Sequence, residues 1–301
     1  MLKKTLQNAT QMRKSVNKGK IIRIISNLYS VLVNDTIIEA RARGKFRKDE
    51  ISPMVGDEVI IDIEKKYIIE ILPRKNYLTR KLHREMGQLA AEKGIDLVIC
   101  VTSTKEPDLS LNLLDKQLAF LALHNIPSMI CFTKYDLLND SEKQEINNLK
   151  KYYQSIGITV VINSEITKIK EILKGKEVGL LGQSGAGKSS LVNKLGNYDI
   201  KTQKISKALG RGIHTTRHVE IYKVSDFYLI DTPGFSALDL NFTTKDNLKN
   251  GFIEFQNYEC RFKDCKHYKE IDCGIKEEVG KSILPSRYEN YINFLEKEQW
   301  K

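Results

Sequence analysis

The sequence feature that most restricts the fold is a glycine-rich loop between an apolar run and a helix-forming segment, GLLGQSGAGKSSL. Its spacing, Gly182-x4-Gly187-Lys188-Ser189, and its strand–loop–helix setting are typical of a phosphate-binding loop. The glycines let consecutive backbone N–H groups face a phosphate, aided by the positive end of the helix. We expect Lys188 to reach the β- and γ-phosphates and Ser189 to ligate Mg²⁺. The pattern predicts an α/β domain that binds a nucleoside triphosphate.

The segments around this loop repeat the alternation of apolar strand and helix. Continuous apolar runs lie at 95–103, 127–133, 158–163, 177–182, 218–224 and 227–232, and helical patterns follow the first, second and fourth of these runs. Apolar strands that are covered by helices on both faces form parallel or mostly parallel sheets. The region therefore predicts an α/β fold in which the loops after the strands carry the site.

Two further motifs suggest a sensor of the third phosphate. The apolar run FYLIDTPG ends at Asp231, whose carboxylate is expected beside the metal, and Gly234 offers its N–H to a γ-phosphate. Between this run and the glycine-rich loop lies GRGIHTTRH, where Thr215 or Thr216 can complete the Mg²⁺ shell. An ordinary polar loop is the alternative interpretation of this segment.

A base-reading motif precedes the phosphate motifs. CFTKYDLL places Thr133, Lys134 and Asp136 at the end of an apolar run. A carboxylate there can accept hydrogen bonds from N1–H and the N2 amino group of guanine, a donor pair that adenine lacks, so Asp136 predicts GTP over ATP. The stem of Lys134 can cover the base, and Asn163-Ser164-Glu165 can add a backbone N–H to the guanine oxygen.

The order of the motifs is base, phosphate loop, switch and DTPG, whereas ordinary GTPases place the base motif last. A sheet cut open elsewhere and rejoined can hold the same site, so the order predicts a circularly permuted GTPase. The residues expected to contact GTP are Thr133, Lys134, Asp136, Ser164, Gly182, Gln183, Ser184, Gly185, Ala186, Gly187, Lys188, Ser189, Ser190, Thr215, Thr216, Asp231 and Gly234.

The N-terminal region has a different pattern. Five β-branched runs lie at 20–26, 29–35, 36–43, 57–63 and 67–72. Short strands at this spacing predict a small closed barrel such as the OB-fold, which commonly binds oligonucleotides. The chain carries a net charge of +11, and Arg41, Arg43, Lys45, Arg47 and Lys48 crowd one strand end and the next loop. These charges favour nucleic acid as the partner. A barrel that serves only as a spacer, with a basicity that reflects overall composition, is the alternative.

The five cysteines fall into two groups. Cys100 and Cys131 lie inside apolar runs and are expected to be buried and reduced. Cys260-x4-Cys265-x-His267-x5-Cys273 supplies three thiolates and one imidazole, the set that closes a structural Zn²⁺ site. A short polar segment of this kind needs a metal to fold, which makes a cluster of free thiols the weaker interpretation.

Together these motifs resemble the ribosome small-subunit-dependent GTPase A family, which are bacterial circularly permuted GTPases. The resemblance rests on the barrel, the order TKYD–GQSGAGKSS–GRGIHTT–DTPG and the cysteine–histidine cluster, and covers the chain from about residue 19. It implies binding to the small ribosomal subunit near the decoding region of its ribosomal RNA, and low intrinsic GTPase activity that the subunit stimulates. It also implies a late assembly checkpoint that releases other assembly factors. Residue 133 is Thr where Asn is usual, a change expected to weaken guanine affinity, whereas His214 stands where the family usually carries His.

Phe235 follows DTPG in place of the water-orienting Gln of Ras-like proteins. We therefore hypothesise slow hydrolysis by the free protein, with His214 or an ordered switch aligning the water once RNA is bound. We also hypothesise that loss of the γ-phosphate reorients residues 235–301 and releases the subunit.

We expect four segments, namely a flexible basic tail (1–18), an OB-fold barrel (19–75), the permuted GTPase domain (76–240) and a zinc-binding domain with helices (241–301). No apolar run reaches the roughly 18 residues of a transmembrane helix and the N-terminus lacks the apolar core of a secretory signal, so we expect a cytoplasmic monomer without membrane contact. Two other functions remain open. A small-molecule kinase would need a second substrate pocket, and an RNA-binding protein that uses GTP only for structure would show no turnover.

Overall fold

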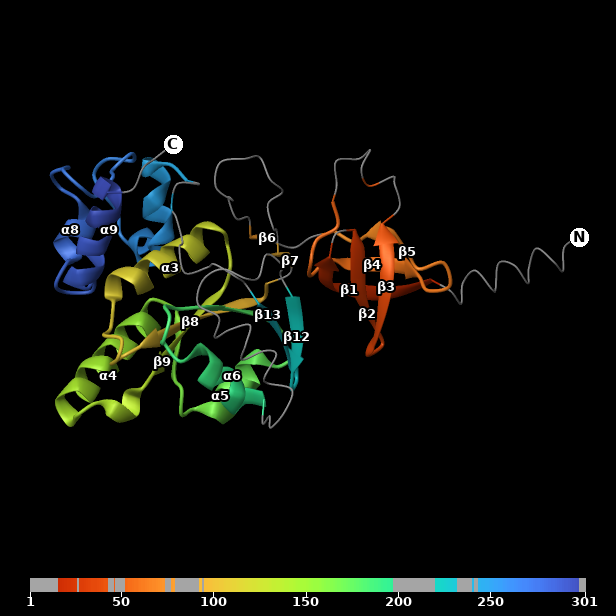
Figure 1. Cartoon of the computed structure of the whole chain (residues 1–301). Helices are drawn as coiled ribbons and strands as arrows, with labels where there is room; N and C mark the ends of the chain where they lie inside the picture. The colour runs from red at the N-terminus through yellow and green to blue at the C-terminus, as the bar shows by residue number, and fades with distance from the viewer. Residues whose placement is uncertain are drawn as a thin grey trace, which may run out of the picture. The chain divides into compact units, whose positions relative to one another are not determined.

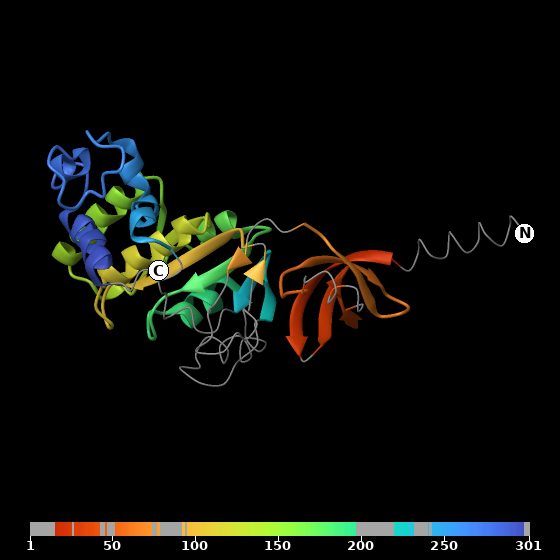
Figure 2. The same cartoon turned by 90° about the horizontal axis from the view of Figure 1, so that it is seen from above.

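The computed structural model of the chain is shown in Figure 1 and, turned by 90°, in Figure 2. It describes residues 16–25, 27–42, 46, 52–73, 77–78, 92–93, 95–196, 220–231, 240 and 243–297. These residues fall into two compact units, one built mainly on the N-terminal strands and the other containing residues 96–196 and 243–297.

The N-terminal strands form a closed five-stranded barrel. Hydrogen bonding follows the order β1-β2-β3-β5-β4 and returns to β1, with β3 and β5 parallel and the other pairs antiparallel. The strands are β1 (Val16–Ile25), β2 (Leu28–Val33), β3 (Thr36–Ala42), β4 (Glu58–Asp62) and β5 (Tyr67–Ile71). This pairing confirms the predicted OB-type barrel, and β1 begins at Val16, inside the segment expected as a tail.

Local sequence explains the closure of the barrel. Asn34 and Asp35 both take a positive φ between β2 and β3, which is the geometry of the two-residue turn that matches strand twist. β1 is long enough to pair with β4 through its first half and with β2 through its second, across a register shift between Ile21 and Arg23. The side chains that fill the barrel are fully buried: Ile21, Val31, Val59, Ile61 and Ile68.

The second unit is built on four parallel strands in the order β10-β9-β8-β11. They are β8 (Leu97–Ser103), β9 (Ser128–Thr133), β10 (Thr159–Ile162) and β11 (Glu177–Leu181). Every residue of β8 and β11 is buried, as expected for strands covered on both faces.

The remaining strands form two pairs. β12 (Glu220–Val224) and β13 (Phe227–Asp231) are adjacent strands, and a separate antiparallel pair joins β6 (Tyr77–Leu78) to β7 (Glu92–Lys93).

A helix follows each parallel strand, and those after β8, β9 and β11 lie in the predicted helical patterns. The helices are α3 (Leu111–Leu123), α4 (Asp140–Ser155), α5 (Ile166–Leu173) and α6 (Lys188–Gly196). Ser110 caps α3 by accepting from the Leu113 N–H, and Asn139 forms a capping box with Glu142 at α4. These caps fix where each loop ends, which positions the loops at the carboxyl edge of the sheet.

The C-terminal segment of this unit combines short helices with a small aromatic core. It contains η2 (Lys245–Gly251), η3 (Ile253–Asn257), α8 (Gly274–Glu278) and α9 (Pro285–Lys297). Phe252 contacts the rings of Phe255, Tyr291 and Phe294, which joins η3 to α9. The ribbon view shows α9 beside the start of α3, and the Asn112–Asn290 hydrogen bond of 2.9 Å joins the two helices (Figure 1). Among the described residues, no helix is long and apolar enough to cross a membrane.

Candidate nucleotide site and metal centre

The carboxyl ends of the four parallel strands bring the predicted motifs together. Loops after β8, β9, β10 and β11 leave the same edge of the sheet, where ligands bind in open α/β folds. The candidate base-reading residues follow β9 and β10, and the glycine-rich loop follows β11. Motifs that lie far apart in the sequence therefore share one site.

Gly182 opens the phosphate loop at a position where only glycine fits. Its φ is +150°, and an added Cβ would lie 2.3 Å from the carbonyl oxygen of Val101 on β8. A side chain there would force the loop away from the sheet edge. Gly187 also has a positive φ, of +90°, directly before α6 begins at Lys188. The loop thus turns from a buried strand into the N-terminus of a helix, as a phosphate site requires.

Lys188 closes this loop on itself. Its Nζ donates to the carbonyl oxygens of Gly182 at 2.6 Å and Gln183 at 2.8 Å. Burial lowers the pKa of Lys188, because a partly desolvated ammonium is less stable than one in water. The two carbonyls offer the Lys188 ammonium only the partial negative charge of a dipole, whereas a phosphate anion would offer a full negative charge. The lysine is therefore placed to exchange loop carbonyls for phosphate oxygens.

The base-reading segment is tied to the phosphate loop by Thr133. Its hydroxyl donates to the carbonyl oxygen of Ala186 at 2.6 Å, and the side chain is 1% exposed. Its own carbonyl accepts from the N–H and the hydroxyl of Thr104, at 3.1 and 2.9 Å. The end of β9 is therefore held on one side by the loop after β8 and on the other by the phosphate loop.

Beyond Thr133 the chain turns outward. Lys134 takes a left-handed φ of +58°, and its Nζ donates to the carbonyl oxygen of Glu106. Asp136 follows in the short helix η1 (Tyr135–Leu137) and is exposed, and within the described part of the chain its carboxylate has no partner. An exposed, unpaired carboxylate at this edge can accept from a ligand.

The segment after β10 leaves one N–H available. The Asn163 N–H donates to Phe132, the Glu165 N–H to Ile162 and the Ile166 N–H to Ser164, all at 2.9 Å. The Ser164 N–H has no hydrogen-bond partner among the described residues, and Ser164 is exposed. Partial burial acts to raise the pKa of Glu165, but the Ile162 N–H and Lys150 outweigh it and lower the pKa, which keeps Glu165 as the anchor of this turn.

Sequence reasoning missed the loop after β8, residues 104–110. This loop provides the acceptor for Lys134, and the carbonyl oxygen of Asp108 accepts from Gln183 Nε2 at 3.5 Å. Pro107 lies beside Gly185, where an added Cβ would be 3.6 Å from its ring. The signal that could have revealed the loop is its place after a fully apolar strand and before the capping residue Ser110.

Several predicted site residues lie outside the described residues. These are Thr215, Thr216, Gly234 and the proposed water-aligning His214, together with Arg43, Lys45, Arg47 and Lys48 of the basic loop. Asp231 ends strand β13, but its side chain is also outside the described set. The roles of these residues stay predictions from sequence.

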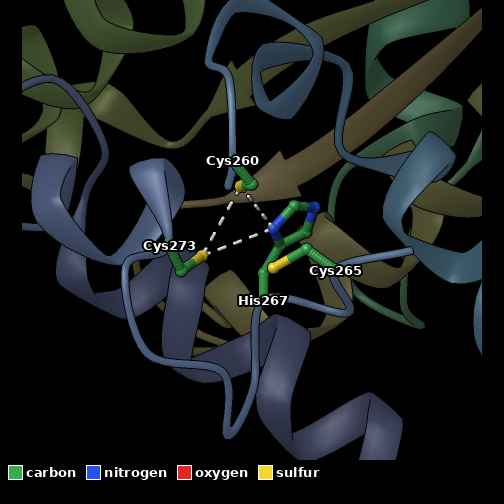
Figure 3. A group of neighbouring side chains, drawn as sticks. All are labelled: Cys260, Cys265, His267 and Cys273. Carbon is green, nitrogen blue, oxygen red and sulfur yellow. Dashed lines mark hydrogen bonds between the residues drawn. The ribbon is translucent and has the colours of Figure 1, made fainter. Parts of the chain in front are cut away.

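The cysteine–histidine cluster forms a compact donor set. The ligand atoms of Cys260, Cys265, His267 and Cys273 all lie within 4.8 Å of one another and point inward (Figure 3). His267 Nδ1 is 3.4 Å from the sulfurs of Cys260 and Cys273, which are 3.8 Å apart. A tetrahedral ion with metal–sulfur distances of about 2.3 Å separates its sulfurs by about 3.8 Å, so the donor set fits zinc.

The surroundings of the cluster suit a structural ion. Burial lowers the pKa of His267 to about 4, which keeps the imidazole in the neutral form that binds metals. Burial also raises the pKa of the Cys265 thiol to about 12, a cost that a bound cation offsets by stabilising the thiolate. The hydroxyls of Tyr288 and Tyr291 hold the loop by donating to the carbonyls of His267 and Lys266, at 2.8 and 2.6 Å.

A buried charged cluster joins this module to helix α3, and sequence reasoning did not identify it. Arg287 on α9 donates to Asp115 of α3 at 2.7 Å and through two nitrogens to Glu254 of η3. All three side chains are at most 2% exposed. Asp115 also accepts from Tyr153 at 2.8 Å and Asn290 at 2.7 Å. The opposing charges raise the pKa of Arg287 well above its usual value although burial acts to lower it.

The fold and this site define a class. It is a P-loop GTPase of permuted order with a metal-binding module. The phosphate loop follows β11, Thr133 holds the base-reading segment against that loop, and the Cys3His cluster follows the β12–β13 pair in the sequence. Comparison with known proteins gives the family. Residues 71–241 match the family model described as RsgA GTPase, and residues 18–68 match the RsgA N-terminal domain.

Relatives agree with these matches over nearly the whole chain. "Small ribosomal subunit biogenesis GTPase RsgA 2" of Listeria innocua is 40% identical, covering 93% of this chain and 96% of its own length. The corresponding protein of Enterococcus faecalis is 38% identical over 92% of this chain and 94% of its own. Two solved structures, YjeQ from Thermotoga maritima and "YloQ, a circularly permuted GTPase", are 30% identical with TM-scores of 0.79 and 0.76. Each covers 93% of this chain, which spans 97% and 94% of theirs. The chain belongs to the RsgA family of circularly permuted GTPases.

Proposed function

We propose that this protein is a GTP-driven switch of small ribosomal subunit assembly, which hydrolyses GTP to GDP and phosphate when it is bound to the subunit. The observation that carries the proposal is the 2.6 Å hydrogen bond from Thr133 to Ala186, because it joins the base-reading segment to the phosphate loop. Relatives whose names contain "small ribosomal subunit biogenesis" match over 93% of the chain.

The proposal gives each site residue a role that its motif suggests. Asp136 accepts from N1–H and N2 of guanine, and the Ser164 N–H donates to O6. Lys188 moves from the carbonyls of Gly182 and Gln183 to the β- and γ-phosphates. The loop from Gly182 to Ser190 encloses the phosphates. When bound, Mg²⁺ would neutralise phosphate charge, held by Ser189 with Thr215 or Thr216 near Asp231.

The barrel supplies the contact with RNA, and the switch residues and the zinc-binding module control when GTP is hydrolysed and the subunit is released. The barrel binds ribosomal RNA through the basic residues at the end of β3 and in the loop that follows; of these, Arg41 lies on β3 and is exposed. Hydrolysis is slow in the free protein, and docking lets His214 align the attacking water. The Gly234 N–H senses the γ-phosphate, and its loss reorients the zinc-binding module and releases the subunit at a late checkpoint. The four-segment division, a cytoplasmic location and a monomeric state belong to the same proposal.

The test is GTP hydrolysis by the zinc-loaded protein alone, with purified small subunits and with large subunits, using ATP as the competing substrate. We expect a large, GTP-specific acceleration by small subunits alone. Lys188→Ala should abolish it, whereas Lys194→Ala, an exposed lysine on the same helix, should leave it unchanged. Turnover of ATP or of a small molecule would favour a kinase, and binding of subunits without turnover would favour a purely RNA-binding role.

Two variants address the finer steps. His214→Ala should lose most of the subunit-stimulated turnover while binding GTP as before, and full turnover would remove the assignment to His214. Affinity for small subunits should differ between a GTP analogue and GDP, and equal affinities would contradict release on hydrolysis. The affinity should also fall steeply with salt if the barrel contacts RNA phosphates.

A further inference from the structure

The hydroxyl of Thr133 has a single proton, and the structure shows where it goes. Oγ1 lies 2.6 Å from the carbonyl oxygen of Ala186 and 3.5 Å from that of Thr102. Both neighbours are acceptors, so the proton is donated to the nearer one, Ala186. The side chain is 1% exposed, and no rotation of the hydroxyl serves a ligand without giving up this bond. Thr133 therefore has no donor left for a nucleotide.

The lack of a free donor on Thr133 matters because one edge of guanine presents acceptors. Around the ring the polar groups follow the order N2, N1, O6, N7, and both O6 and N7 are acceptors. In the proposed guanine site, Asp136 takes N2 and N1 and the Ser164 N–H takes O6, so N7 is the next polar position, and residue 133 at the end of β9 is the candidate to contact it. Recognition of N7 would need a donor there. An asparagine amide has two N–H groups and can serve both the loop carbonyl and N7, but threonine cannot.

We propose that this protein binds guanine without recognition of N7 by residue 133, and that Thr133 acts instead as a positioning residue that holds the phosphate loop. The inference rests on the proposed guanine site. Base specificity then comes from Asp136 and Ser164. The contact from Thr133 orders the Ala186 carbonyl for any nucleotide, which gives Thr133 a role besides the expected weakening of guanine affinity.

The direct test compares GDP, ADP and 7-deaza-GDP, in which a C–H replaces N7, by calorimetric titration of the wild-type zinc-loaded protein. We expect 7-deaza-GDP to bind within about twofold of GDP, because no hydrogen bond is lost. Binding weaker by about tenfold or more would overturn the inference while leaving guanine specificity intact. Equal binding of ADP and GDP would instead contradict the proposed function.

Variants separate positioning from base reading. Thr133→Val keeps the shape but removes the donor, so GDP and 7-deaza-GDP should both weaken by about tenfold and their ratio should stay near one. Thr133→Ser restores the hydroxyl and should bind like wild type. Thr133→Asn adds a second donor and should favour GDP over 7-deaza-GDP. A Thr133→Val variant with unchanged affinity, or a Thr133→Asn variant without discrimination, would contradict the assignment.

Discussion

The substitution Arg287→Met should destabilise the second unit strongly, because it leaves two carboxylates buried without their cation. Arg287 makes hydrogen bonds to Asp115 and Glu254, and none of these side chains is more than 2% exposed. Asp115 would keep the hydroxyl of Tyr153 and the amide of Asn290, whereas among the described residues Glu254 would keep only the hydroxyl of Tyr152 at 3.3 Å. Removing one partner from a buried ion pair typically costs about 3–5 kcal/mol, and we expect about 4 kcal/mol here.

The assay is urea denaturation of the zinc-loaded protein followed by far-UV circular dichroism, with amide hydrogen exchange of α9 as a local probe. Arg287→Lys keeps the charge but not the planar fork, so about half of the loss should remain. Lys143→Met removes a partly exposed lysine whose ion pair with the exposed Asp140 spans 3.9 Å, and should change little. An Arg287→Met variant as stable as Lys143→Met would refute the reasoning that these carboxylates depend on Arg287.

Replacing all three charges tests the same idea from the other direction. With Asp115→Asn and Glu254→Gln added to Arg287→Met, no charge remains buried without its partner. Neutral replacement of a buried ion cluster is often tolerated, so the triple variant should recover part of the lost stability. If it were less stable than Arg287→Met alone, the loss would come from packing around α9 and not from the unpaired charges.

Three other outcomes follow from the site and the core. Asp136→Asn should weaken GTP binding at least tenfold and improve XTP binding, because an amide N–H can donate to the xanthine O2; unchanged selectivity in competition binding would contradict the role of Asp136. Alkylation followed by mass spectrometry should label no cysteine in the zinc-loaded protein, three after chelation and all five in denaturant, since Cys100 and Cys131 are 0% exposed. Labelling of fewer than three after chelation would mean that the cluster folds without metal. Burial raises the pKa of Cys100 from 9.0 to about 12, so the stability that its protonated thiol contributes is full below about pH 9 and is lost as pH rises toward 12. The stability gap between wild type and Cys100→Ala should therefore narrow by about 1.4 kcal/mol per pH unit in urea titrations above pH 9, and parallel pH profiles would contradict this.

The elements that the sequence predicted are those whose signal is local. The strands of the barrel and of the sheet begin and end within a few residues of the predicted runs, because turn residues such as Asn34 and Asp35 and the apolar run of β8 fix them. The phosphate loop and the metal cluster could equally be predicted from the sequence, because the spacing of a few residues already determines their geometry. Cys100 and Cys131 are buried as predicted from the apolar runs around them.

The features that were missed depend on contacts across the fold. Asp115 and Arg287 are separated by 172 positions, and the local pattern of neither helix indicates that they meet. The packing of α9 on α3 is what brings these charges into one buried cluster. Thr133 was identified as a departure from the usual asparagine, but its bond to Ala186 spans 53 positions and cannot be read from the motif.

The buried cluster also limits how a signal from the nucleotide can reach the zinc-binding module. The module is joined to the GTPase core both by the chain after β13 and by Arg287, and moving it alone would break the contacts with Asp115 at a cost of several kcal/mol. Moving it together with α3 keeps those contacts. α3 begins at Ser110, directly after the loop whose Asp108 accepts from Gln183 of the phosphate loop. The proposed reorientation on loss of the γ-phosphate would therefore be less costly if α3 and the module moved as one body, with residues 104–110 as the joint.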